Sequence, residues 1–217
     1  LGALRTAYSI LKQCDELDAS AHYLAGFEAD RGACRRILND LKNALYAGRT
    51  PGESVELLKR YRLKLDNVPL ALNKAPLKIA VIGEIFTIID PLSNLFIEEK
   101  LMDYGVATTR LLTPTWWLRN MALKPLGLYA RRVYKASDRY MPYPVGGHGK
   151  ECVGEAVLAQ TDGLDGAIQI FPLGCMPEVV AKSLIPTIRE EMDFPILTLV
   201  VDEATGEAGY ITRIEAF

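Results

Sequence analysis

The pattern of apolar and polar residues changes about one third of the way along the chain. In residues 1–64 apolar side chains recur three and four positions apart, as in ALRTAYSILKQCDEL and GACRRILNDLKNALYAG. This spacing predicts amphipathic helices. A third helix is predicted to begin after Thr50 as its N-cap, with Pro51 at its first position. Residues 65–76 are rich in turn formers and proline, which predicts a linker.

From residue 77 onward, continuous apolar runs alternate with helical patterns such as KECVGEAVLAQTDG and PEVVAKSLIPTIREEM. Buried strands that alternate with helices are typical of a parallel sheet covered on both faces. Residues 77–217 are therefore predicted to form a three-layer, Rossmann-like α/β domain with a mostly parallel sheet, preceded by the helical segment. The four strands are expected near residues 77–84, 106–113, 166–173 and 195–202.

A further helix is predicted between the first two strands, in the stretch DPLSNLFIEEKLMDYG. Asp90 has the side chain of an N-cap, Pro91 suits the first helical position, and Gly105 suits the residue that follows a helix. The sequence therefore predicts one helix that starts directly after Asp90.

The composition and net charge of the chain exclude some classes of function. The chain is 49% hydrophobic and 24% charged, with a net charge of −2. This balance predicts an ordinary globular protein and argues against a general polyanion binder. No apolar run is long enough to span a bilayer, and the start has no signal-peptide pattern. The four cysteines are scattered rather than paired, so we expect a cytoplasmic protein. The first residue is not Met, so we also expect that the sequence is a piece of a longer chain.

The stretch 116–139 holds six basic residues, one acidic residue and both tryptophans. This stretch could bind CoA phosphates, a partner protein or single-stranded nucleic acid. It could equally be a solvated amphipathic helix with packed tryptophans, which is the interpretation we favour. We therefore predict neither a nucleic-acid nor a membrane partner.

The predicted strands end in residues with useful chemistry. In an open parallel α/β sheet, ligands bind outside the carboxyl ends of the strands. The first strand leads into Glu84, and the third leads into Gly174 and Cys175. Glu84 could be a functional acid or a buried carboxylate with its own partners.

Cys175 lies at the predicted start of a helix, because Pro177 suits the first helical position. The free N–H groups and the helix dipole at that end favour a thiolate, which is the form that binds metals and acts as a nucleophile. A packed cysteine at a strand end is the alternative.

The stretch GGHGKE places Gly146, Gly147 and Gly149 around His148, with Glu151 next. It is not a Walker loop, because Pro144 stands where the first glycine is needed and Glu151 replaces Ser or Thr. Its backbone N–H groups could contact an anion or a thioester. A plain glycine-rich helix entry explains the pattern about equally well.

Several of these stretches together resemble a known family. They are KIAVIGEIFTIIDPLSNLFIEEKL, GGHGKECVGEAVLAQTDGLDGAIQIFPLGCMPEVVAKSLIPTI and PILTLVVDEATGEAGYITRIEAF. They resemble the C-terminal part of the acyl-CoA dehydratase activase-related proteins, a domain-of-unknown-function family also described as CoA-substrate-specific enzyme activase-like. That family is similar to the iron–sulfur subunits of the 2-hydroxyacyl-CoA dehydratases. The resemblance covers roughly residues 77–217. Residues 1–64 correspond to the family only in their position along the chain.

The resemblance implies a redox role in anaerobic metabolism. A [4Fe–4S] cluster would be held by strand-end cysteines, of which Cys175 matches the last. Cys14 and Cys34 do not match the other ligand motifs, and Cys152 is not assigned, so these 217 residues are expected to lack the cluster. An ATP-hydrolysing activase would be the partner, and an acyl-CoA-type molecule the ligand.

The resemblance also implies roles for the remaining strand-end residues. The acid–base or substrate-contacting groups would be Glu84, His148 and Glu151, and Gly146, Gly147 and Gly149 would contact the cofactor. The chain would then serve in low-potential electron transfer or CoA-thioester chemistry. The alternative is a non-catalytic Rossmann-like scaffold that binds the activase or a CoA ligand.

Overall fold

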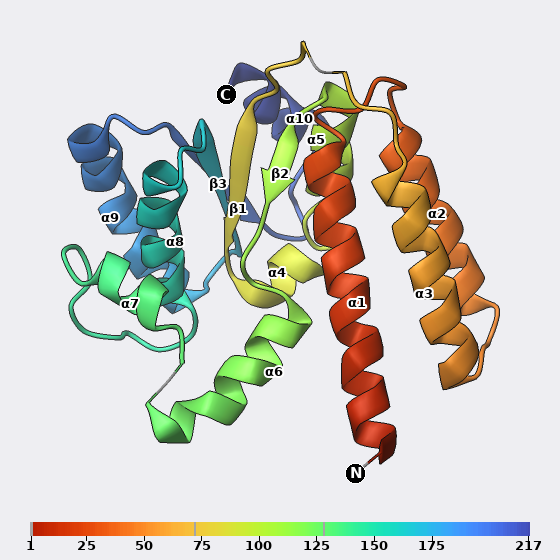
Figure 1. Ribbon diagram of the computed structural model, residues 1–217. Helices are drawn as coiled ribbons and strands as arrows, with labels where there is room; N and C mark the ends of the chain where they lie inside the picture. Colours follow the sequence, from red (N-terminus) through yellow and green to blue (C-terminus); the bar gives the residue numbers. More distant parts are fainter. Residues whose placement is uncertain (1, 72, 128) are drawn as a thin grey trace. The chain divides into compact units, whose positions relative to one another are not determined.

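The computed structural model describes residues 2–71, 73–127 and 129–217 (Figure 1). Helices dominate, and four short strands lie between them. Among the described residues, no helix combines the length and the apolar character needed to cross a bilayer. The elements in chain order are α1 (Gly2–Leu24), α2 (Ala33–Tyr46), α3 (Pro51–Asp66), β1 (Lys78–Gly83), α4 (Ile85–Ile89), α5 (Ile97–Tyr104), β2 (Ala107–Thr109), α6 (Pro114–Leu123), the 3-10 helix η1 (Lys124–Leu126), α7 (Arg131–Ser137), α8 (Gly149–Thr161), β3 (Gly166–Pro172), α9 (Met176–Met192), β4 (Ile196–Val201) and α10 (Glu207–Ala216).

The strands form one sheet in the order β2-β1-β3-β4. β1 pairs with β3 in parallel, with Ile79 opposite Gly166 and Gly83 opposite Ile170. β3 pairs with β4 in parallel, from Ala167 opposite Ile196 onward. Buried, mostly apolar strands of this kind need helices on both faces. The predicted Rossmann-like α/β fold with a parallel sheet is confirmed.

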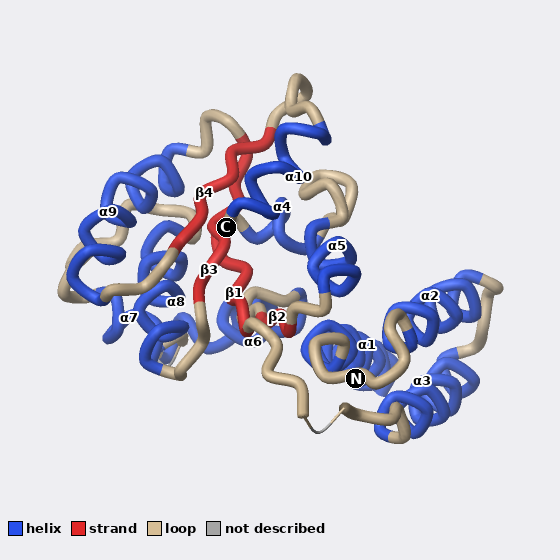
Figure 2. Tube along the Cα trace, turned by 90° about the horizontal axis from the view of Figure 1, so that it is seen from above, coloured by secondary structure: helices blue, strands red, loops and turns tan. Residues whose placement is uncertain are grey.

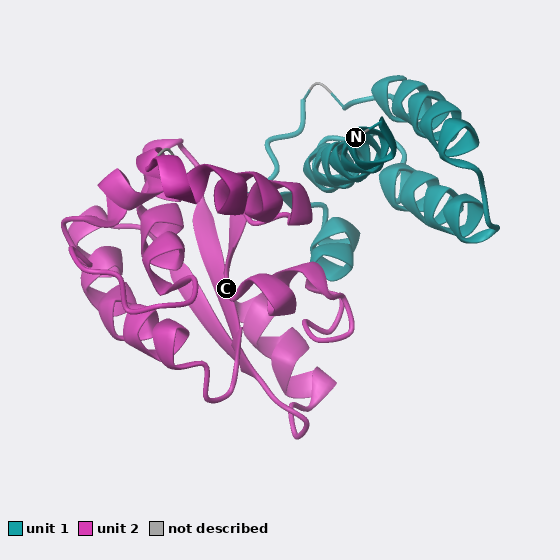
Figure 3. Ribbon diagram, turned by 90° about the horizontal axis from the view of Figure 1, so that it is seen from below, with its two compact units in different colours: residues 1–77, 98–109 teal, residues 78–97, 110–217 magenta. Residues whose placement is uncertain are grey.

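The chain divides into two compact units (Figure 3). The first unit comprises residues 1–77 together with 98–109. Its helix α3 begins as the sequence predicts, because Thr50 and Glu53 form a reciprocal capping box and Pro51 follows the cap. The core of this unit is formed mainly by apolar side chains of the three N-terminal helices, among them Leu17, Ala21, Leu38, Leu58 and Leu65, and Met102 of α5 joins them.

The second unit comprises residues 78–97 and 110–217. Within it α8 and α9 cover one face of the sheet, and α4 and α10 cover the other (Figures 1 and 2). Side chains alternate between the two faces along each strand. Ala80, Ile82, Ala167 and Ile196 belong to the core under α8 and α9. Gln169, two positions after Ala167, shares that face.

The prediction that a helix begins directly after Asp90 is wrong. Asp90 instead ends α4, and residues 91–96 form turns before α5 begins at Ile97. Asn94 explains the delay. Its buried amide donates to the carbonyl oxygens of Thr87 and Ile88 and accepts from the N–H of Ile97. These bonds hold a tight turn that a continuing helix would break.

Candidate functional site

The carboxyl ends of β1 and β3 lie side by side in the second unit, and the chain leaves them in opposite directions. β1 leads into α4 on one face of the sheet, whereas β3 leads into α9 on the other (Figure 2). Such a point, where neighbouring connections diverge, is where open α/β sheets bind ligands. Glu84 is the N-cap of α4 and Cys175 is the N-cap of α9. With Glu178 in the first turn of α9, these residues are called the strand-end site.

Glu84 is held in place by the backbone of both strands. Gly83 has a φ of 127°, a conformation that L side chains rarely adopt. The N–H of Glu84 donates to the carbonyl oxygen of Ile170 at 3.0 Å. The Glu84 carboxylate accepts from the N–H of Thr87 at 2.8 Å and from its hydroxyl at 3.0 Å. Glu84 therefore has a structural role as a helix cap, and its charge is fixed beside the end of β3.

Cys175 does not have the activated thiol that its position at a helix start predicts. Its thiol is half-buried, and burial raises its pKa above the usual value. The N–H of Glu178 donates to the sulfur and lowers the pKa, but the carboxylates of Glu178 and Glu84 raise it further. The expectation of a readily formed thiolate is therefore wrong, because desolvation and two nearby acids outweigh the helix terminus.

Glu178 is fully buried beneath the end of β3, with an exposed fraction of 0%. It accepts a hydrogen bond from the amide of Gln169 at 3.0 Å, and the same amide nitrogen lies 3.5 Å from the sulfur of Cys152. Gln169 in turn accepts from the hydroxyl of Thr198 at 3.0 Å. Because the hydroxyl occupies the amide oxygen, the amide nitrogen is directed toward Glu178.

Burial raises the pKa of Glu178 to about 7. The charges of Glu84 and Glu151 act in the same direction, whereas hydrogen bonds from Gln169 and Cys152 oppose the rise. A carboxyl group with such a pKa exchanges its proton near neutral pH. This is the range in which a general acid or base works best.

Two further glutamates of α8 complete a buried glutamate cluster of Glu151, Glu155 and Glu178. Neither carboxyl oxygen of Glu155 has a hydrogen-bond partner among the described residues, and the same holds for one oxygen each of Glu151 and Glu178. Burial and the charges of the other two glutamates raise the pKa of Glu155 well above its usual range. Burial therefore favours the protonated form of Glu155.

Glu151 is anchored differently from its neighbours. Its other oxygen accepts a hydrogen bond from the hydroxyl of Tyr134 at 3.0 Å. Burial, and then the charge of Glu151, raises the pKa of that phenol. Tyr134 therefore stays a hydrogen-bond donor to Glu151, and this bond connects α7 to the first turn of α8.

The glycine loop packs against the start of α9. A side chain at Gly147 would meet the ring of Pro177 at 2.8 Å, and one at Gly149 would meet the Pro177 carbonyl oxygen at 2.5 Å. Gly146 and Gly147 both have positive φ, and no atom lies within 4 Å of where a Gly146 side chain would begin. Two of the three glycines thus allow α8 to approach α9 closely.

His148, the N-cap of α8, makes no side-chain capping bond and is half-buried. The structure thus brings Glu84 and Cys175 to neighbouring strand ends, and it places Gly147 and Gly149 against Pro177. Glu151 belongs to the buried cluster rather than to the solvent edge. Among the residues that the structure describes, no hydrogen bond or ion pair joins the His148 side chain to Glu84 or Cys175.

Sequence reasoning missed Glu155, Glu178 and Gln169. One signal was available for Gln169, since it is the only polar residue inside the strand GAIQIFP. A polar side chain in a fully buried strand needs a partner, and that partner is Glu178. Glu155 gave a weaker signal, as a charged residue among the small and apolar residues of α8.

No family model, no curated protein and no solved structure matches the chain.

Proposed function

We propose that the chain is a component of an acyl-CoA dehydratase-like redox system, in which the strand-end site binds an acyl thioester and Glu178 transfers a proton beside it. The carrying observation is that Glu84, Cys175 and Glu178 converge where β1 and β3 diverge into opposite layers. The substrate class and the ATP-hydrolysing activase partner rest on the sequence resemblance. The position and acid–base chemistry of the site rest on the geometry of the second unit.

Glu178 suits proton transfer for three reasons. Its pKa of about 7 lets it take or release a proton near neutral pH. Gln169 fixes one of its oxygens, so the carboxyl group keeps one orientation. Burial raises the pKa of neighbouring Glu155 and favours its neutral form, which limits the charge repulsion that ionised Glu178 meets.

The resemblance also implies a [4Fe–4S] cluster, and the cysteines of this chain do not fit one. Such a cluster takes about three or four thiolates. Cys14 and Cys34 belong to the helices of the first unit, and Cys152 is fully buried in the core of the second. Only Cys175 combines a strand-end position with partial exposure. No step of the proposed function is therefore assigned to a cluster held by these residues alone.

Anaerobic reconstitution of the 217-residue chain with iron and sulfide tests this conclusion about the cluster. We expect no visible absorption band of a cluster, because one partly exposed thiol at a strand end cannot replace three or four ligands. The control is Cys175→Ala, which should give the same featureless spectrum. A stable band in the unsubstituted chain that disappears in Cys175→Ala would show that our ligand assignment is wrong.

Thioester binding can be tested through the reactivity of Cys175. Acetyl-CoA should slow alkylation of Cys175 by iodoacetamide at alkaline pH, as followed by peptide mass spectrometry, and ATP should not. Cys34 is the internal reference, because it is buried and its pKa is raised to about 12. Glu178→Gln should change the pH profile of Cys175 alkylation, since Glu178 raises the pKa of that thiol. The matched control Glu190→Gln, an exposed position on the same helix, should not.

Two results would count against the proposed function. If acetyl-CoA and ATP protect Cys175 equally, the site recognises a nucleotide rather than a thioester. If neither protects it, the strand-end site does not bind this class of ligand, and the scaffold interpretation of the second unit is preferred.

A further inference from the structure

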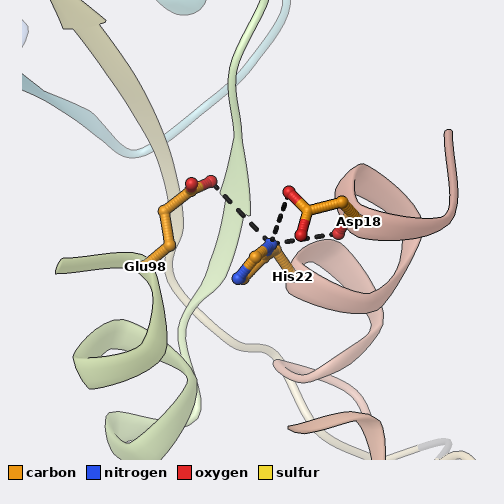
Figure 4. A group of neighbouring side chains, drawn as sticks. All are labelled: Asp18, His22 and Glu98. Atoms are coloured by element: carbon orange, nitrogen blue, oxygen red, sulfur yellow. Dashed lines mark hydrogen bonds and ion pairs between the residues drawn. The ribbon is translucent and has the colours of Figure 1, made fainter. Parts of the chain in front are cut away.

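The first unit contains a group of metal-ligating side chains that the proposed function does not use. Asp18 and His22 lie one turn apart on α1, and Glu98 belongs to the first turn of α5 (Figure 4). One ligand atom from each of the three lies within 4.8 Å of the others. All three residues belong to the same compact unit.

Figure 4 shows the imidazole of His22 with one ring nitrogen turned toward both carboxylates. This nitrogen, Nδ1, is 3.5 Å from an oxygen of Asp18 and 3.9 Å from an oxygen of Glu98. In a tetrahedral zinc site, bonds of about 2.0–2.2 Å place neighbouring ligand atoms roughly 3.3–3.5 Å apart. The two separations measured from Nδ1 are close to these values, and all three ligand atoms lie within 4.8 Å of one another, so small side-chain rotations would bring them onto one ion.

The surroundings of the group also suit an ion. The side chains of His22 and Glu98 are 4% and 7% exposed, which separates them from the exposed acidic groups common on protein surfaces. Asp18 is 21% exposed and gives access from solvent. Imidazole and carboxylate ligands together suit first-row divalent cations such as Zn²⁺.

We propose that Asp18, His22 and Glu98 bind a divalent transition-metal cation, with Zn²⁺ as the best-matched ion and water as the remaining ligand. Without the ion, Nδ1 lies 3.0 Å from the carbonyl oxygen of Asp18, the distance of a donated hydrogen bond. The neutral ring can carry its proton on Nε2 instead, which frees Nδ1 for the metal. The bound ion connects α1 to the segment 98–109, which is far from α1 in sequence, and so stabilises the first unit.

The test uses the intact chain, purified with chelator and titrated with Zn²⁺ by calorimetry and with Co²⁺ by visible absorption. We expect one ion per chain, a Co²⁺ spectrum without thiolate charge transfer, and a higher unfolding midpoint with Zn²⁺. Asp18→Asn and Glu98→Gln keep the side-chain shape, and each should weaken Zn²⁺ binding at least ~10-fold, the smallest loss usual for groups that merely support a ligand. Circular dichroism of both variants without metal checks that the helices remain.

Two control variants separate this site from other binding. Glu16→Gln removes the same charge from an exposed position on α1, where the carboxylate pairs with Lys12, and should bind Zn²⁺ normally. Cys14→Ser removes the thiol one turn before Asp18 and should also bind normally. Absence of saturable binding, or loss of binding in Cys14→Ser but not in Asp18→Asn, would overturn the proposal. His22 and the two carboxylates would then form only an ion-pair group.

Discussion

Replacing Gly83 with alanine should lower the free energy of unfolding of the second unit by about 2–5 kcal/mol. A Cβ atom at this position would lie 2.1 Å from the carbonyl oxygen of Ile170, which is backbone and cannot move aside. The φ of 127° adds strain for any residue other than glycine. Because Glu84 follows directly, the same change should also displace the helix cap that belongs to the strand-end site.

Urea unfolding followed by tryptophan fluorescence measures this effect in the correct unit. Both tryptophans, Trp116 and Trp117, lie on α6 of the second unit. The control is Gly206→Ala, since Gly206 has an ordinary φ of −75° and no atom lies within 4 Å of the added methyl group. Because Gly206 is the N-cap of α10, where alanine is less favourable than glycine, the change should cost at most about 1 kcal/mol. Equal unfolding midpoints for the two variants would contradict the close approach at Gly83.

Local signals in the sequence were sufficient for most of the fold. The cap at Thr50 and the helix start around Pro177 are encoded by residues next to each other, and both were predicted. The first, third and fourth strands begin and end within about one residue of the predicted bounds, because apolar runs mark them. The second strand, predicted as residues 106–113, is only Ala107–Thr109. Its predicted continuation, residues 110–113, contains Leu111 and Leu112 but is no longer strand.

The late start of α5 could not be predicted, because Asn94 determines it through bonds to residues on both sides. Leu95 and Phe96 also adopt positive φ, which no propensity of these residue types favours. In the strand-end site, too, local features could be predicted and features set by tertiary packing could not. The positions of Glu84 and Cys175 follow from strand ends, which are local features. The burial of Cys175 becomes visible only in the folded structure, and burial is the largest cause of the raised pKa of its thiol, so the sign of that shift was predicted wrongly.

The second large effect concerns the pH dependence of stability. Folding raises the pKa of Glu178 from its usual 4.5 to about 7, so the folded chain binds a proton that the unfolded chain has already lost between these values. The stability from this group is therefore fully present below pH 4.5 and is lost as the pH rises through about 7. A shift of this size corresponds to about 3 kcal/mol. Glu155, whose pKa is also raised, adds a loss of the same sign.

Glu178→Gln should make stability much less dependent on pH, because an amide does not titrate. Its oxygen can still accept the bond from Gln169, although its own N–H groups cost roughly 1–3 kcal/mol at every pH if they stay unpaired. The informative quantity is thus the change in unfolding free energy between about pH 4.5 and pH 8, which should be smaller in the variant by about 3 kcal/mol. Urea unfolding at several pH values gives this difference, with the exposed Glu190→Gln as the matched control. A parallel pH profile for Glu178→Gln and the unsubstituted chain would show that Glu178 is ionised in the folded protein, and it could not then hold a proton for the strand-end site.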